Sequence, residues 1–229
     1  MIAAVVIDIE GTTSPTSSVR DGLYGYTRGQ LGQWLADNIG GAADSVIAET
    51  RELAGRPGAA TAEVAEILRQ WLDSDVKAGP LKTVQGLICA AGFRAGVLHG
   101  EFFDDVPAAL AAWHDAGIGL HVYSSGSVRN QQDWFGYARG DELASLISGW
   151  FDLANAGGKR ESSSYAMIAR TIGVASDRIL FLSDHPDELD AAAAAGWSVL
   201  GIHRPGEPNS PRPPHRWITS FDEVDLPGR

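Results

Sequence analysis

The sequence feature that most constrains the fold is an apolar run at the start of the chain that ends in two acids. Residues 2–7 read IAAVVI, and Asp8 and Glu10 follow, with one residue between them. A short, continuous apolar run is typical of a strand that is covered on both faces, as in a parallel sheet. In open α/β sheets, ligands bind at the carboxyl ends of the strands. The opening of the chain therefore predicts a buried strand followed by candidate functional acids.

Strand and helix patterns alternate in the second half of the chain. Strands are expected over residues 119–124, 178–183 and 197–202. Helices are expected over residues 107–116, 165–172 and 187–196, and a glycine ends each of them. This alternation predicts an α/β fold with a doubly wound, mainly parallel sheet.

More than a hundred residues separate the first expected strand from the second. A structureless loop of that length is rare in a compact domain. Apolar residues in this stretch keep the spacing of amphipathic helices, most clearly between Val64 and Leu72. We therefore expect a catalytic core formed by residues 1–14 and 100–229, with a helical domain, residues 15–99, inserted into it.

Composition and charge exclude several classes of protein. The net charge of −11 argues against nucleic-acid binding, which needs clustered lysine and arginine. The single cysteine, Cys89, allows no internal disulfide, so we expect a reducing, cytoplasmic setting. We find no leader peptide and no apolar run long enough to span a membrane. The absence of a heptad pattern and the acidic surface favour a monomer.

Polar residues lie at the ends of three of the expected strands. Ser124 and Ser125 follow the second strand, Asp184 follows the third, and Lys159 precedes a helix. Hydroxyl groups, backbone N–H groups and a lysine are suited to holding a phosphate. Because these strand ends meet at one edge of the sheet, we expect a phosphate site there.

The acids in this group suggest phosphoryl transfer. A carboxylate such as Asp8 can attack phosphorus and form an aspartyl-phosphate. Two like charges about 4 Å apart repel by about 4 kcal/mol at an effective dielectric constant near 20, so a divalent cation is needed. Mg²⁺ fits, with Asp8 and Asp184 as ligands. Glu10, on the same side of the chain as Asp8, can then transfer protons.

Each of these residues also has an ordinary structural explanation. Acids after a strand are often turn residues or helix caps, and serine-glycine clusters are usually loops. Lys159 alone is typical of a solvated surface charge, and Asp184 alone of a helix N-terminus. The combination at three separate strand ends is what favours a functional site.

The order of these residues resembles the haloacid dehalogenase superfamily, and more closely its enolase-phosphatase family of methionine salvage. The segments that carry this resemblance are DIEGTT (8–13), LKTVQG (81–86), YSSGSV (123–128), KRESSSY (159–165) and LFLSD (180–184). The resemblance covers residues 2 to about 205.

The resemblance implies a Mg²⁺-dependent enzyme that converts 2,3-diketo-5-methylthiopentyl-1-phosphate into acireductone and phosphate, with the inserted helices as a cap. It implies that Asp8 is the nucleophile and a metal ligand, and that Glu10 binds the metal through its carbonyl and acts as acid and base. It further implies that Ser124, Ser125 and Lys159 bind the substrate and that Asp184 completes the metal site.

Three alternatives remain open at this point. Another phosphatase or phosphomutase of the same superfamily would share the strand-end residues. A dehalogenase would not need Mg²⁺. A non-catalytic phosphate-binding module would use the same fold without chemistry.

Overall fold

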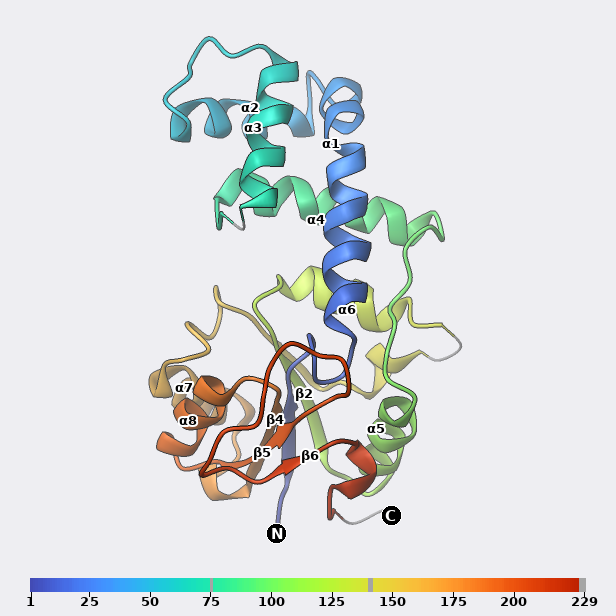
Figure 1. The fold of residues 1–229 in the computed structure, drawn as a ribbon, viewed down its shortest axis with the longest axis vertical. Helices are drawn as coiled ribbons and strands as arrows, with labels where there is room; N and C mark the ends of the chain where they lie inside the picture. Colours follow the sequence, from blue (N-terminus) through green and yellow to red (C-terminus); the bar gives the residue numbers. More distant parts are fainter. Residues whose placement is uncertain (75, 140–141, 227–229) are drawn as a thin grey trace. The chain divides into compact units, whose positions relative to one another are not determined.

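A computed structural model describes residues 1–74, 76–139 and 142–226. The chain divides into two compact units, which we describe separately. The first unit contains Met1–Thr16 and His99–Arg229, and the second contains Ser17–Leu98 (Figure 1). Among the residues described, every helix is too short or too polar to cross a lipid bilayer.

In the part of the chain that the structure describes, the first unit contains a sheet of six strands in the order β3-β2-β1-β4-β5-β6. All neighbouring strands are parallel. The strands are β1 (Ala4–Ile7), β2 (Gly119–Tyr123), β3 (Gly149–Phe151), β4 (Ile179–Ser183), β5 (Ser198–Ile202) and β6 (Trp217–Ile218). The order of the strands reverses at β1, which confirms the predicted doubly wound α/β fold and places the ligand crevice beside the end of β1.

Helices cover both faces of this sheet (Figure 1). They are α5 (Asp105–Asp115), α6 (Val128–Gly136), α7 (Ser162–Ile172) and α8 (Pro186–Ala194). Val6, Phe181 and Tyr123 pack into one buried cluster with residues of α7 and α8. Helix α5 packs against β2 on the other side. Because β1 is enclosed on both faces, all four of its residues are buried, which explains the continuous apolar run at the start of the chain.

The sequence patterns did not reveal β3 and β6. β3 has three residues and β6 has two, which is too short to show any alternation of apolar and polar side chains. Both lie at the edges of the sheet, where one neighbour is enough to form the hydrogen bonds. The other four strands lie within one or two residues of the predicted ranges.

The second unit is helical throughout its regular structure. It contains a π-helical segment (Ser18–Tyr24), α1 (Gly25–Asp37), α2 (Ala42–Leu53), α3 (Thr61–Asp73) and α4 (Gly79–Arg94). Leu31, Leu68 and Val84, from three of these helices, meet in one buried cluster. The carboxylate of Glu63 accepts a hydrogen bond from the N–H of Ala60 at 2.9 Å and caps the start of α3. The cluster gives this unit an apolar core of its own.

His121 is a buried histidine in β2, and one of its ring nitrogens lacks a hydrogen-bond partner among the described residues. Its side chain lies over Gly149, where an added Cβ would approach the His121 Nδ1 to 2.6 Å. That nitrogen has no hydrogen-bond partner among the described residues. Burial lowers the pKa of His121 from 6.5 to about 4. The histidine is therefore neutral in the folded protein at neutral pH.

This shift predicts a loss of stability in acid. The unfolded chain binds a proton near pH 6.5 and the folded chain only near pH 4, so the stability present above pH 6.5 falls as the pH drops towards 4. Urea unfolding at pH 7.5 and 4.5 should show that His121→Leu loses about 2 to 3 kcal/mol less than the unmodified protein over this range. The control is Thr171→Leu, at an exposed position of the same unit, which removes no titratable group and should keep the original pH dependence. An unchanged pH dependence in His121→Leu would contradict the assignment.

Candidate active site

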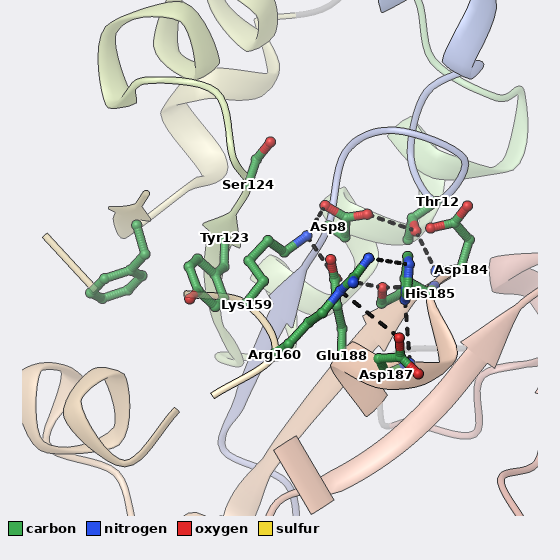
Figure 2. A network of polar contacts seen from close by, with 12 residues as sticks. Asp8, Thr12, Tyr123, Ser124, Lys159, Arg160, Asp184, His185, Asp187 and Glu188 are labelled. Atoms are coloured by element: carbon green, nitrogen blue, oxygen red, sulfur yellow. Dashed lines mark hydrogen bonds and ion pairs between the residues drawn. The ribbon is translucent and has the colours of Figure 1, made fainter. Parts of the chain in front are cut away.

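The carboxyl ends of β1, β2 and β4 bring the predicted residues to one edge of the sheet. Asp8 directly follows β1, Ser124 directly follows β2 and Asp184 directly follows β4. β1 pairs with both β2 and β4, so these residues lie on neighbouring strand ends (Figure 2). Asp8, Ser124 and Asp184 are all buried.

A tight turn after Asp8 brings the chain against Asp184. The N–H groups of residues 12–14 donate in turn to the carbonyl oxygen of Ile9, at 3.2, 3.0 and 2.9 Å. Gly11 has a φ of 71°, and a Cβ added there would lie 2.2 Å from Oδ2 of Asp184. Glycine is required at this position by its backbone conformation and by the close approach of the carboxylate.

Lys159 lies between two carboxylates at the centre of the site (Figure 2). Its Nζ is 2.5 Å from Oδ1 of Asp8 and 2.7 Å from Oε2 of Glu188. Burial alone would lower the pKa of Lys159, but the two carboxylates outweigh that effect and raise the pKa above its usual value. Lys159 is therefore a fixed positive charge at neutral pH, and its position next to Asp8 is the one suited to binding an anion there.

Asp184 adds a third carboxyl group to this buried cluster. Burial and then the negative charge of Asp8 raise the pKa of Asp184. Burial also raises the pKa of Glu188, although Lys159 opposes the shift. If all three carboxyl groups were ionised, the ammonium group of Lys159 would leave two negative charges without compensation. The site therefore favours the addition of positive charge.

The chemistry of these donors fits a divalent cation. Mg²⁺ is usually bound through one or two carboxylates together with waters and phosphate oxygens. Asp8 and Asp184 supply two such carboxylates on adjacent strands. Within the described residues, no group of three or more histidine, cysteine or acidic side chains is placed to hold a metal ion. The donor set suits a cation that takes its remaining ligands from the backbone, water and substrate.

Thr12 and Asn209 hold the acids in place, and sequence reasoning missed both. The Thr12 Oγ1 accepts a hydrogen bond from the N–H of Asp184 at 2.9 Å and lies 3.5 Å from Oδ2 of Asp8 (Figure 2). The Asn209 Nδ2 donates to Oδ2 of Asp184 at 2.7 Å. Thr12 thus links the two acids, and Asn209 fixes one oxygen of Asp184.

Arg204 stabilises the turn after Asp8 through hydrogen bonds to its backbone. Its Nε and Nη2 donate to the carbonyl oxygen of Thr12 at 3.2 and 3.1 Å, and its Nη1 contacts both carboxylate oxygens of Asp105 at 2.9 and 2.8 Å. The guanidinium carbon lies 4.5 Å from the ring centroid of Phe103 and 5.1 Å from that of Phe221. Arg204 is 3% exposed, so it acts as a buried bridge between the active-site turn, α5 and the segment around Thr219, whose carbonyl oxygen accepts from its Nη1 at 3.0 Å.

Arg204 and Asn209 belong to the proline-rich segment 203–216, which the sequence marks only as irregular. An arginine and an asparagine in such a segment are ordinary surface residues in most proteins. What distinguishes them is the burial of Arg204 and the contact of Asn209 with Asp184, and both depend on how the segment folds. In the sequence alone, no property of these residues indicates a place in the site.

The remaining predicted residues lie on the flanking loops. Glu10 is half-buried in the turn and forms an isolated bridge with Ser14. The N–H of Ser124 donates to the carbonyl oxygen of Phe151 at 3.1 Å, so Ser124 is held against the neighbouring strand. Ser125 is exposed. Their roles in binding and proton transfer remain predictions.

Several known proteins resemble this chain over most of its length. The protein-family description "haloacid dehalogenase-like hydrolase" matches residues 2–196. "Enolase-phosphatase E1" of Nocardia farcinica (strain IFM 10152) is 67% identical over 226 residues, which cover 99% of this chain and 97% of that protein. "Enolase-phosphatase E1" of Streptomyces avermitilis is 51% identical over 208 residues, with 90% and 87% covered.

A solved structure shows the same arrangement of elements. The crystal structure of the UTR4 protein from Saccharomyces cerevisiae matches with a TM-score of 0.83 and 29% identity, covering 98% of this chain and 100% of that chain. By family, sequence identity and coverage, this chain belongs to the haloacid dehalogenase-like hydrolases and, among them, to the enolase-phosphatases.

Proposed function

We propose that this protein is a Mg²⁺-dependent enolase-phosphatase of methionine salvage. It converts 2,3-diketo-5-methylthiopentyl-1-phosphate into acireductone and phosphate. The Enolase-phosphatase E1 relatives support the choice of this reaction within the family. The observation that carries the phosphatase chemistry is the buried contact of Lys159 with Asp8, beside Asp184.

Asp8 is the nucleophile in this proposal. Its Oδ1 is paired with Lys159 at 2.5 Å, whereas its Oδ2 has the longer, 3.5 Å contact with Thr12. Oδ2 is therefore the oxygen that is freer to attack phosphorus. A bond forms between this oxygen and phosphorus as the ester P–O bond breaks, which gives an aspartyl-phosphate on Asp8. Water then attacks the phosphorus, and Asp8 is released with inorganic phosphate.

Glu10 moves the protons of both steps. Protonated Glu10 donates to the ester oxygen that leaves, and the carboxylate then accepts a proton from the attacking water. Its place in the turn, two residues after Asp8, supports this assignment. Mg²⁺, held by the carboxylates of Asp8 and Asp184 and the carbonyl of Glu10, would offset the repulsion between phosphate and carboxylates.

Lys159, Ser124 and Ser125 bind the phosphate group of the substrate. The buried ammonium group of Lys159 contacts the carboxylates of Asp8 and Glu188. A phosphate that binds there would replace one of these carboxylates as a partner of the ammonium group. The serines bring small hydroxyl and N–H donors on the loop after β2.

The proposal includes a catalytic core of residues 1–14 and 100–229, with residues 15–99 as its cap. The division of the chain into two compact units supports it. A cap has a physical use, because the enol formed during the reaction is reactive and has to be kept from bulk water. We also propose that the enzyme is a cytoplasmic monomer, from its single cysteine and its acidic surface.

Turnover of the diketone phosphate ester tests the reaction. Enediol absorbance and free phosphate should rise together in the presence of Mg²⁺, and both should be lost with a chelator and return when Mg²⁺ is added in excess. Phosphate release without enediol would instead identify a simple phosphatase of the same family. A phosphorylated product would identify a mutase, and activity that persists with the chelator would contradict the metal requirement.

Replacement of the nucleophile should abolish turnover and leave the fold intact. Asp8→Asn removes a negative charge from beside Asp184, so the melting temperature should not fall, while phosphate release should drop by about a thousandfold or more. Phosphate release and thermal unfolding measure the two effects. Asp177→Asn, at an exposed position of the same unit, is the control and should behave like the unmodified protein. Appreciable turnover by Asp8→Asn would rule out Asp8 as the nucleophile.

A further inference from the structure

A buried glutamine lies beneath the loop that follows β2. Gln131 belongs to α6 and is 1% exposed. The loop above it, residues 124–127, contains Ser124 and Ser125, which the proposed function assigns to phosphate binding. The N–H groups of Ser125 and Ser127 donate to no other group in the part of the chain that the structure describes. These two N–H groups are therefore available to a ligand.

The side-chain amide of Gln131 makes its hydrogen bonds to the described residues through its nitrogen. Nε2 donates to the carbonyl oxygens of Gly126 at 2.8 Å and Phe151 at 2.9 Å, and lies 3.5 Å from that of Ser124. Its Oε1 has no partner among the described residues. Only a donor can face three carbonyl oxygens, so these contacts fix the orientation of the amide.

These contacts set the direction of the loop N–H groups. The C=O and N–H of a trans peptide point in opposite directions. Because the carbonyl of Gly126 points towards Gln131, the N–H of Ser127 points away from it. The longer contact with the carbonyl of Ser124 orients the N–H of Ser125 in the same way. Both free N–H groups thus face away from α6.

Gly126 makes such a restraint necessary. A Cβ added at Gly126 would meet its nearest atom, Oγ of Ser124, at 3.8 Å, so lack of space does not explain the glycine. Glycine leaves the adjoining peptide groups free to rotate. A rotated Gly126–Ser127 peptide would present its carbonyl oxygen in place of the N–H, and an oxygen there would repel a phosphate. The hydrogen bond from Gln131 opposes that rotation.

The start of α6 itself is already occupied. The carboxylate of Asp152 accepts from the N–H of Val128 at 3.0 Å, and the hydroxyl of Ser127 accepts from the N–H of Asn130 at 3.3 Å. These helix N–H groups are therefore not free to bind a ligand. In contrast to these two helix N–H groups, the loop N–H groups of Ser125 and Ser127 have no acceptor among the described residues.

We propose that Gln131 is a positioning residue for phosphate binding. It holds the 124–127 loop with the N–H groups of Ser125 and Ser127 turned outward, so that they meet the phosphate group of the substrate. This inference rests on the proposed function, because it assigns the loop to a phosphorylated substrate. Gln131 does not touch the reacting atoms.

Binding of inorganic phosphate in the presence of Mg²⁺ tests this role without turnover. Gln131→Met keeps the size of the side chain and removes both donors, so phosphate affinity measured by calorimetry should fall about 10- to 100-fold. Mg²⁺ affinity, measured in the absence of phosphate, should not change. The matched control is Gln132→Met, the exposed neighbour on the same helix, which should bind phosphate normally.

A second variant guards against a folding defect. Gln131→Asn keeps the amide and retracts it by about 1.5 Å, so the hydrogen bonds should be lost with less disturbance of packing. Phosphate affinity should again fall at least about tenfold in this variant, below its melting temperature. Affinity within about threefold of the unmodified protein, in either folded variant, would overturn the proposal. An equal loss of phosphate and Mg²⁺ affinity would also overturn it, because that pattern indicates general damage to the site.

The outcome separates this inference from the proposed reaction. If the unmodified protein binds phosphate and does not convert the diketone ester, the reaction is wrong and the role of Gln131 is still decided by the variants. If the unmodified protein does not bind phosphate with Mg²⁺, the loop is not a phosphate site and the role of Gln131 is rejected with it.

Discussion

Compensation of negative charge around Asp8 is the constraint on which the rest of the site depends. Three carboxyl groups converge there, and Lys159 supplies the positive charge that contacts two of them. Like charges about 4 Å apart at an effective dielectric constant near 20 repel by about 4 kcal/mol, which is a large part of the stability of a typical domain. Buried ion pairs of this kind add little net stability compared with apolar packing. The proposed reaction, in which a phosphate and a divalent cation enter the same space, would give these charges a function.

The parallel sheet brings Asp8 and Asp184 together, and a glycine turn and buried hydrogen bonds set their final positions. β1 lies between β2 and β4, so the residues that follow these three strands lie next to one another at one edge of the sheet. Gly11 then allows the turn after β1 to approach the carboxylate of Asp184 more closely than a residue with a Cβ atom could. From the segment after β5, Arg204 reaches the same turn and Asn209 reaches the carboxylate of Asp184. The 124–127 loop, for which we propose phosphate binding, is held by the hydrogen bond from Gln131 to the carbonyl oxygen of Gly126. The strand ends thus carry Asp8 and Asp184, and hydrogen bonds from Arg204 and Gln131 to backbone carbonyl oxygens orient the turn and the loop beside them.

The sequence predicted the parts of this arrangement that depend on local pattern. The apolar run before Asp8 predicts a strand covered on both faces, and β1 is such a strand. The acids and serines after the strands were found because strand ends share one edge of a parallel sheet, and Lys159 was found as a lysine just before an expected helix. β3 and β6 were missed because two or three residues show no periodicity. Thr12, Asn209, Arg204 and Gln131 were missed for another reason: each matters through a contact made by folding, and their residue types alone do not indicate one.

The most direct test of the account is a crystal structure of the protein with Mg²⁺ and beryllofluoride, which mimics a phosphoryl group on a carboxylate. We expect the beryllium bonded to a carboxylate oxygen of Asp8, Mg²⁺ bound between Asp8 and Asp184, and Lys159 in contact with a fluorine. Beryllofluoride bound away from Asp8, or Mg²⁺ bound without Asp184, would contradict the account.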